Sequence, residues 1–172
     1  MVTHTEITTR ILPLKAQKWM PLRYRPCETN AAGNFSLRNL LMDIGGYYAA
    51  AGVAERVDVR AYCPDLPLAI SGEIREVAVL VDTFFRRALS AVNEGGAVHL
   101  RVKLLSEEKI ELSISDNSAG MTRAELSQFA RTMAKGCRYY QEAMIFRKLE
   151  SDFRISSDPN AGTMVAFTLP RA

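Results

Sequence analysis

Residues 80–96 read LVDTFFRRALSAVNEGG, the pattern of a helix that ends at a double-glycine turn. The apolar spacing of three and four residues begins further upstream, so one amphipathic helix is predicted from Glu73 to Val92. Its apolar stripe consists of Ile74, Val77, Ala78, Val81, Phe85, Ala88, Leu89 and Val92. Gly95 and Gly96 end the helix, since glycine readily adopts the backbone conformations of a tight turn.

Further helices and strands are predicted on both sides of this helix. Ser36 is a candidate N-cap, and Thr122 with Glu125 three residues later has the pattern of a capping box. The other predicted helices begin at Ser36 and Thr122 and cover 138–149, and the predicted strands are 56–62, 66–70, 97–104, 109–115, 153–156 and 163–169. This order predicts an α+β fold, a two-layer α/β sandwich in which helices cover one face of a mixed sheet.

The first 35 residues differ from the rest of the chain. They contain three prolines and five lysine or arginine residues, and they show no sustained periodicity. We therefore predict a basic, proline-containing arm over 1–35, with one strand at 8–14, and a compact domain over 36–172. The cations of the arm bind a partner, or the arm lies on the domain as a solvated tail; the pattern leaves both alternatives open.

The composition excludes several classes of function. A net charge of +3 is too weak to indicate nucleic-acid binding. No apolar run approaches the roughly 20 residues that span a bilayer, and no signal-peptide pattern is evident. The three cysteines are widely spaced, which argues against a disulfide framework or a metal site. These observations predict a cytoplasmic protein that neither enters a membrane nor binds nucleic acid.

Three more stretches are informative when taken together with residues 80–96. They read FSLRNLL at 35–41, ISDNSAGM at 114–121 and GTMVAFTLP at 162–170. In this order and spacing they resemble the ATP-binding domain of sensor histidine kinases, a branch of the superfamily that includes DNA gyrase, heat-shock chaperones and mismatch-repair ATPases. Residues 80–96 resemble the N-box helix, 114–121 the G1 box and 162–170 the final strand. The resemblance covers about 35–170 and implies the same sandwich fold.

The resemblance implies an adenine site that is partly retained. Asp116 matches the G1-box aspartate that accepts a hydrogen bond from the adenine amino group. Gly120 matches the second glycine of that box, where the absence of a Cβ lets the backbone approach the ligand closely. Thr163 matches a threonine that supports the aspartate through a hydrogen bond or a water. Ser118 replaces the first glycine and adds a side chain at the rim of the pocket. ATP or ADP is therefore the candidate ligand.

The phosphate side departs from the family pattern. Thr83 and Arg87 occupy the places of the two N-box asparagines, and a guanidinium has no lone pair to offer Mg²⁺. Arg87 contacts a phosphate, fills the pocket as a surrogate cation, or lies on a solvated helix face. In the lid region only Gly136 remains of the glycine box, and Tyr139 and Tyr140 follow it closely. Mg²⁺ binding and kinase activity are therefore not expected, and no catalytic or metal-binding residue is predicted.

These departures lead to a functional hypothesis with alternatives. We expect a degenerate, non-catalytic module of two-component signalling that contacts an acidic partner, such as a response-regulator receiver domain or a kinase. Lys135, Arg138 and Arg147 form its candidate partner surface. The alternatives are an ATP-binding kinase or ATPase domain whose partner supplies the phosphoacceptor, a phosphotransferase relay using His4, and an anti-sigma-like regulator. A homodimer is also left open.

Overall fold

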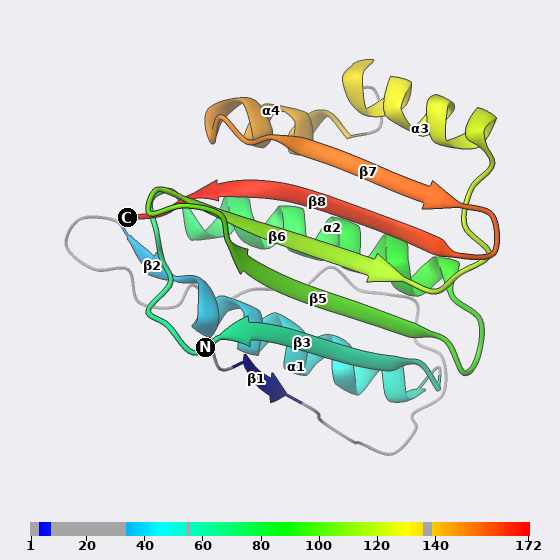
Figure 1. Cartoon of the computed structure of the whole chain (residues 1–172), viewed down its shortest axis with the longest axis horizontal. Coiled ribbons are helices and arrows are strands. Elements are labelled where there is room, and N and C mark those ends of the chain that lie inside the picture. Colours follow the sequence, from blue (N-terminus) through cyan, green and yellow to red (C-terminus); the bar gives the residue numbers. More distant parts are fainter. Residues whose placement is uncertain (1–3, 8–33, 55, 136–138) are drawn as a thin grey trace.

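The chain folds as two layers, a twisted sheet on one side and helices on the other (Figure 1). The computed structural model describes residues 4–7, 34–54, 56–135 and 139–172. The strands are β1 (His4–Ile7), β2 (Phe35–Ser36), β3 (Asp58–Pro64), β4 (Ala69–Ile70), β5 (Ala97–Leu104), β6 (Lys109–Asp116), β7 (Phe153–Asp158) and β8 (Gly162–Pro170). The helices are α1 (Leu37–Ala54), α2 (Ile74–Ala91), α3 (Arg123–Lys135) and α4 (Tyr140–Lys148).

The main sheet has six strands in the order β1-β3-β5-β6-β8-β7. β3 and β5 are parallel and every other neighbouring pair is antiparallel, so the sheet is mixed. Strands β2 and β4 form a separate two-stranded sheet. The predicted α+β two-layer sandwich with a mixed sheet is confirmed. The strand predicted at 66–70 is shorter, because Pro67 has no N–H to donate to a ladder.

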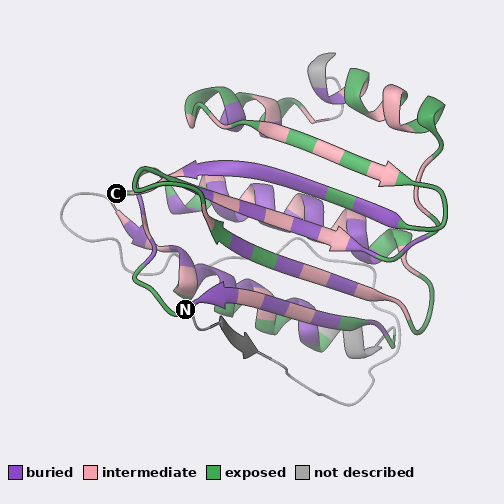
Figure 2. Cartoon of the chain, in the orientation of Figure 1, coloured by how far each residue is buried: buried purple, intermediate pink, exposed green. Residues whose placement is uncertain are grey.

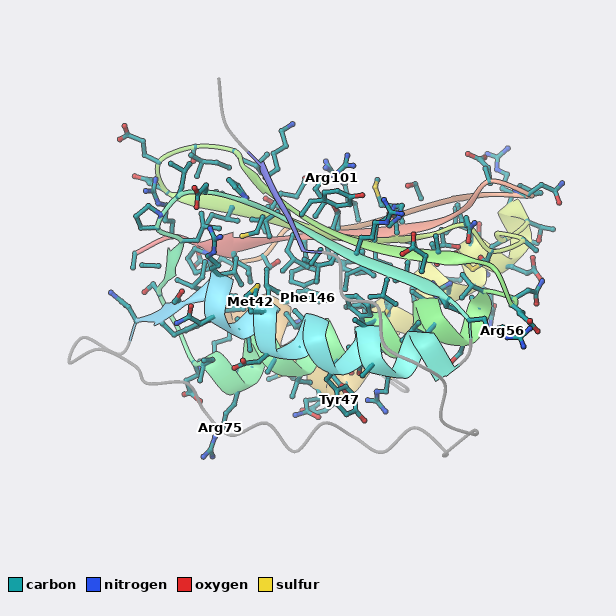
Figure 3. All side chains as sticks on the ribbon, turned by 90° about the horizontal axis from the view of Figure 1, so that it is seen from below. Met42, Tyr47, Arg56, Arg75, Arg101 and Phe146 are labelled. Carbon is teal, nitrogen blue, oxygen red and sulfur yellow. The ribbon has the colours of Figure 1, made fainter. Side chains whose placement is uncertain are left out.

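The core lies between the sheet and helices α1 and α2. Alternate residues of β5 and β6 face the helices and are buried, among them Leu100 and Leu112. The intervening residues lie on the opposite face, where Arg101 points away from the helices (Figure 3). Figure 2 shows this alternation along the strands. Every residue of the predicted α2 stripe is buried except Val92, which packs against the core while partly exposed.

Helix α1 begins as predicted and is fastened to α2 by a buried polar contact. The Oγ of Ser36 accepts a hydrogen bond from the N–H of Asn39 at 3.3 Å. The ring of Tyr48 stacks on Phe85, with centroids 4.8 Å apart, and its hydroxyl donates to Asp82 Oδ1. Burial and the neighbouring carboxylate raise the pKa of Tyr48. The phenol therefore stays protonated and keeps donating to Asp82.

The amino terminus contributes one strand to the sheet. β1 pairs with β3, and His4 stands opposite Pro64 in the register. Part of the predicted arm thus extends the sheet beyond β3, while the strand predicted at 8–14 and the arm's prolines and cations lie outside the described residues. Cys63 is buried, which raises the pKa of its thiol. Among the described helices, none is long and apolar enough to cross a membrane.

The capping box that starts α3 is confirmed. The N–H of Thr122 donates to Glu125 Oε2 at 2.7 Å, and the N–H of Glu125 donates to Thr122 Oγ1 at 3.3 Å. The bonds that the N–H and the hydroxyl of Thr122 donate to the Glu125 carboxylate lower the pKa of Glu125, because they stabilise its ionised form. The cap directs α3 across the end of the molecule, beside β7 (Figure 1).

Candidate nucleotide site and the helices beside it

Asp116 and Thr163 lie side by side at the ends of β6 and β8. They face each other in the strand register. The buried carboxylate of Asp116 accepts the backbone N–H groups of Ser118 at 3.1 Å and Thr163 at 3.2 Å, both on Oδ1. Its Oδ2 makes no hydrogen bond to any residue that the structure describes, so it is free to accept one from a ligand. The two residues predicted for the adenine end are therefore brought together.

Ser157 on β7 completes this polar cluster and was not predicted. Its Oγ accepts the N–H of Met121 at 2.8 Å and lies 2.9 Å from the hydroxyl of Thr163. The same oxygen is 2.8 Å from the carbonyl oxygen of Gly162. The Thr163 hydroxyl is thus engaged with Ser157, and it is the Thr163 backbone that supports Asp116.

Gly120 has a structural reason to be glycine. Its φ is +71°, and a Cβ there would lie 2.0 Å from the carbonyl oxygen of Asp158. Only glycine lets this loop approach the β7–β8 turn so closely. Ser118, at the first glycine position, is also buried, and its hydroxyl accepts the N–H of Gly120 at 3.3 Å. The side chain expected at the pocket rim therefore turns into the loop.

The two N-box positions on α2 contact helices α4 and α3. Thr83 Oγ1 donates to Glu142 Oε1 at 2.7 Å, and Glu142 is only 8% exposed. The Arg87 guanidinium lies over the ring of Phe129, 4.8 Å from its centroid. Nη2 of Arg87 is 3.5 Å from the sulfur of Met121. Arg87 is half-buried, and these contacts favour a packed position over a solvated helix face; its other two roles stay predictions.

These contacts bear on whether Mg²⁺ and phosphate fit. A guanidinium offers only donors, and the Thr83 hydroxyl already donates to a buried carboxylate. In the described ranges no group of three or more His, Cys, Asp or Glu side chains could hold a metal ion. The residues at these positions therefore do not fit Mg²⁺, whereas the donors of Arg87 fit a phosphate and the Asp116 carboxylate fits an adenine amino group.

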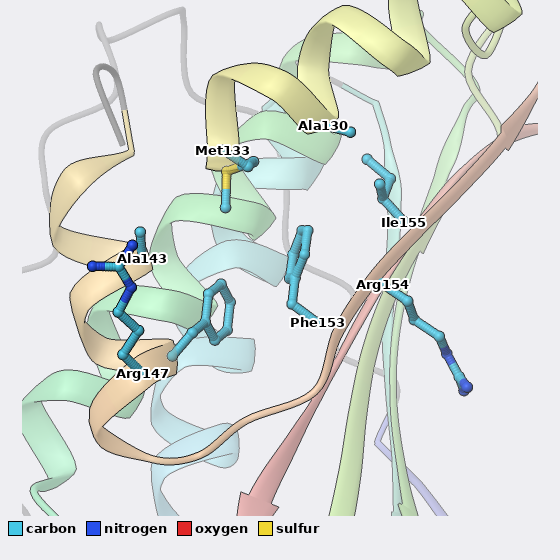
Figure 4. A pocket seen from close by; sticks show the side chains of 8 residues that line it. Ala130, Met133, Ala143, Arg147, Phe153, Arg154 and Ile155 are labelled. Carbon is cyan, nitrogen blue, oxygen red and sulfur yellow. The ribbon is translucent and has the colours of Figure 1, made fainter. Parts of the chain in front are cut away.

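The predicted partner surface is described only in part. The side chains of Lys135 and Arg138 lie outside the described residues. Arg147 is exposed on α4, at the rim of a cavity of about 320 Å³ between α3, α4 and β7 (Figure 4). In Figure 4 the labelled Met133, Phe153 and Ile155 surround this cavity, and the side chain of Arg154 points away from it. Arg147 therefore stands next to an apolar cavity.

Two buried acids escaped the sequence analysis, although a signal was present. Glu142 precedes Ile145 and Phe146 by three and four residues, so it lies on the apolar face of α4. Asp82 lies four residues after Ala78 and three before Phe85, inside the α2 stripe, and pairs with Arg86 at 2.7 Å. An acid at such a position needs a buried partner. The spacing of such an acid along the helix shows that it needs a buried partner, but it does not show which residue that partner is.

No family model matches the chain, and no curated protein does. Solved structures do match. A mycobacterial sensor histidine kinase, MprB, is 16% identical with a TM-score of 0.64, over 80% of this chain and 96% of that one. The catalytic domain of histidine kinase ThkA is 11% identical with a TM-score of 0.65, over 80% and 94%. ThkA has also been solved with the response regulator TrrA, with a TM-score of 0.66 and 11% identity over 81% of this chain and 41% of that one.

The chain therefore has the fold of histidine kinase catalytic domains. Identities of 11% and 16% show the fold alone. The resemblance stated from the motifs is confirmed at this level. What the altered residues do is a separate question, because one fold carries many functions.

Proposed function

We propose that this chain is a non-catalytic, histidine-kinase-like module that regulates two-component signalling through protein contacts. The observation that carries the proposal is that the side chains at both N-box positions contact helices α4 and α3. Thr83 binds Glu142 on α4, and Arg87 lies on Phe129 of α3. Side chains that would have to meet Mg²⁺ and phosphates make intramolecular contacts instead.

Opening this arrangement for Mg-ATP is unfavourable. Releasing Thr83 would leave the Glu142 carboxylate buried without that partner, which costs about 1–3 kcal/mol. Moving Arg87 would remove a cation–π contact of about 0.5–2 kcal/mol. A ligand gains nothing in exchange at the metal position, because Arg87 repels Mg²⁺.

A second candidate is an ATP-binding domain that works with a partner phosphoacceptor. The Asp116 carboxylate, held by two N–H groups with Oδ2 free of described partners, favours it. The phosphotransferase alternative has less support, because His4 lies in strand β1 and not on a helix.

Calorimetric titration with ATP and ADP, each with and without Mg²⁺, separates these candidates. We expect that Mg²⁺ changes the affinity of neither nucleotide and that no phosphate is released, because Arg87 stands at the metal position. Asp116→Asn tests whether any bound nucleotide uses the adenine site. Mg²⁺-dependent tightening together with phosphate release would establish the second candidate instead.

A receiver domain is the proposed partner, and the complex of ThkA with a response regulator supports this choice. We expect this chain to act in the cytoplasm and to capture at least one receiver domain from the source organism. Arg147→Glu should reduce the affinity for that receiver domain about tenfold. Arg101→Glu is the matched control, because this exposed arginine lies on β5, on the face of the sheet opposite to the helices (Figure 3). Capture of no receiver domain, or equal losses in both variants, would contradict the assignment.

A further inference from the structure

Strand β7 ends the sheet and has an open side. The N–H of Thr168 donates to the carbonyl oxygen of Asp152 at 3.1 Å, and the N–H of Ala161 donates to the carbonyl oxygen of Asp158 at 3.0 Å. Because hydrogen-bonded pairs alternate in an antiparallel ladder, Phe153 and Ile155 direct their backbone groups away from β8. No described residue pairs with those groups on that side. They form a template for a further strand.

The side chains of the same two residues enter the cavity beside the strand. Met133 of α3 and Phe146 of α4 form its buried wall, and Ala130 and Ala143 complete the apolar lining. Its volume of about 320 Å³ is at the lower end of the range of roughly 300–1,000 Å³ for small-ligand pockets. Its buried wall offers no charged or polar side chain. The occupant of the cavity is therefore apolar.

The helices beside the groove are built from a cationic stretch of sequence, which favours an acidic occupant. Residues 123–150 contain six lysine or arginine residues against three glutamates. Glu142 is buried against Thr83, and Glu125 is used in the capping box. Arg147 is exposed at the rim and makes no ion pair with the described side chains. Lys148, by contrast, is paired with Glu73 and Glu76.

We propose that the groove between β7 and helices α3 and α4 binds an extended acidic segment of a partner protein as an additional strand. The segment would bond to the open backbone groups of Phe153 and Ile155. Alternate side chains of a strand share one face, so one apolar residue would enter the cavity while an acidic residue two positions away, on the same face, meets Arg147 at the rim (Figure 4). The inference rests on the proposed function and names the chemistry of the partner.

A strand fits better than the other occupants. A small apolar ligand would fill the cavity but leave the backbone groups of Phe153 and Ile155 unpaired. A second copy of this chain would place its own β7 along the edge, and with it a second Arg147 facing the same cationic region. An acidic peptide satisfies the backbone, the cavity and the charge together.

The probe is a fluorescent peptide of about nine residues, with leucine at its centre, glutamates two positions to either side of the leucine and threonines elsewhere. It is titrated into the full chain and its binding is followed by anisotropy. Ala143→Trp fills the cavity, and Ile155→Pro removes an outward N–H without breaking a bond to β8. We expect each to weaken binding at least tenfold. Arg154→Gln is the control, because that side chain pairs with Glu111 and points away from the cavity. The lysine counterpart of the peptide should not bind.

Hydrogen exchange gives a second readout, since the amides of Phe153 and Ile155 should be protected when the peptide is bound. Absence of binding at millimolar peptide, or binding that Ile155→Pro leaves unchanged, overturns the proposal. The proposal is also overturned if decanoate binds while the peptide does not, or if sedimentation shows a dimer that Ala143→Trp abolishes. If a receiver domain is captured through Arg147 but the peptide does not bind, strand addition alone is excluded. If the peptide binds but no receiver domain is captured, the receiver assignment alone is excluded.

Discussion

Replacing Gly162 with alanine should lower the free energy of unfolding by more than about 3 kcal/mol. A Cβ at this position would lie 1.9 Å from the carbonyl oxygen of Asp116, and φ is +89°. The oxygen belongs to the backbone and the Cβ is bonded directly to the backbone, so no side-chain rotation can relieve the overlap. The ends of β6 and β8 would have to separate, which breaks the bond from Thr163 N–H to Asp116 Oδ1. Urea unfolding followed by circular dichroism measures the loss.

Gly95→Ala separates the effect of the steric overlap on stability from the effect of the positive φ. Gly95 also has a positive φ, +81°, but nothing lies within 4 Å of its added Cβ. Its substitution should therefore cost only the left-handed conformation, about 1–2 kcal/mol. If the two variants unfold within about 1 kcal/mol of each other, the close approach of Gly162 to Asp116 is not what makes glycine necessary there.

Elements with a clear local pattern could be predicted from the sequence. The α2 stripe, the β5–β6 hairpin and the capping box of α3 each depend on residues within one or two turns or across a short turn. Their order then allowed only a few layer arrangements, and the motifs at 114–121 and 162–170 selected one of them. Asp116 and Thr163 were placed together correctly for the same reason.

Long-range polar partners could not be predicted in this way. Thr83 and Glu142 are 59 positions apart, and periodicity shows only which face of each helix is buried. The position of Phe129 over Arg87 depends on where the capped α3 crosses α2, which no local pattern encodes. The role of Gly120 illustrates the same limit. The resemblance implies an approach of its backbone to a ligand, while the structure shows an approach to the carbonyl of Asp158.

Phe84→Ala should lower the free energy of unfolding by about 3–5 kcal/mol and loosen α4 selectively. Phe84 is 1% exposed, and its ring centroid lies 6.1 Å from Phe146, 5.6 Å from Phe153 and 6.0 Å from Phe167. This aromatic cluster connects α2 to α4, β7 and β8. Removing its central ring withdraws the support behind Phe146 and Phe153, two walls of the cavity.

The adjacent Phe85→Ala is the matched control. Phe85 is equally buried, but its ring stacks on Tyr48 of α1. Both variants should lose similar global stability, measured by urea unfolding, because each leaves a cavity of similar size. Only Phe84→Ala should speed amide exchange in α4 beyond what the loss of global stability explains. Only Phe84→Ala should also weaken binding of the acidic peptide. Equal exchange in α4 for both variants would mean that the contact of Thr83 with Glu142, rather than the aromatic cluster, holds this helix against α2.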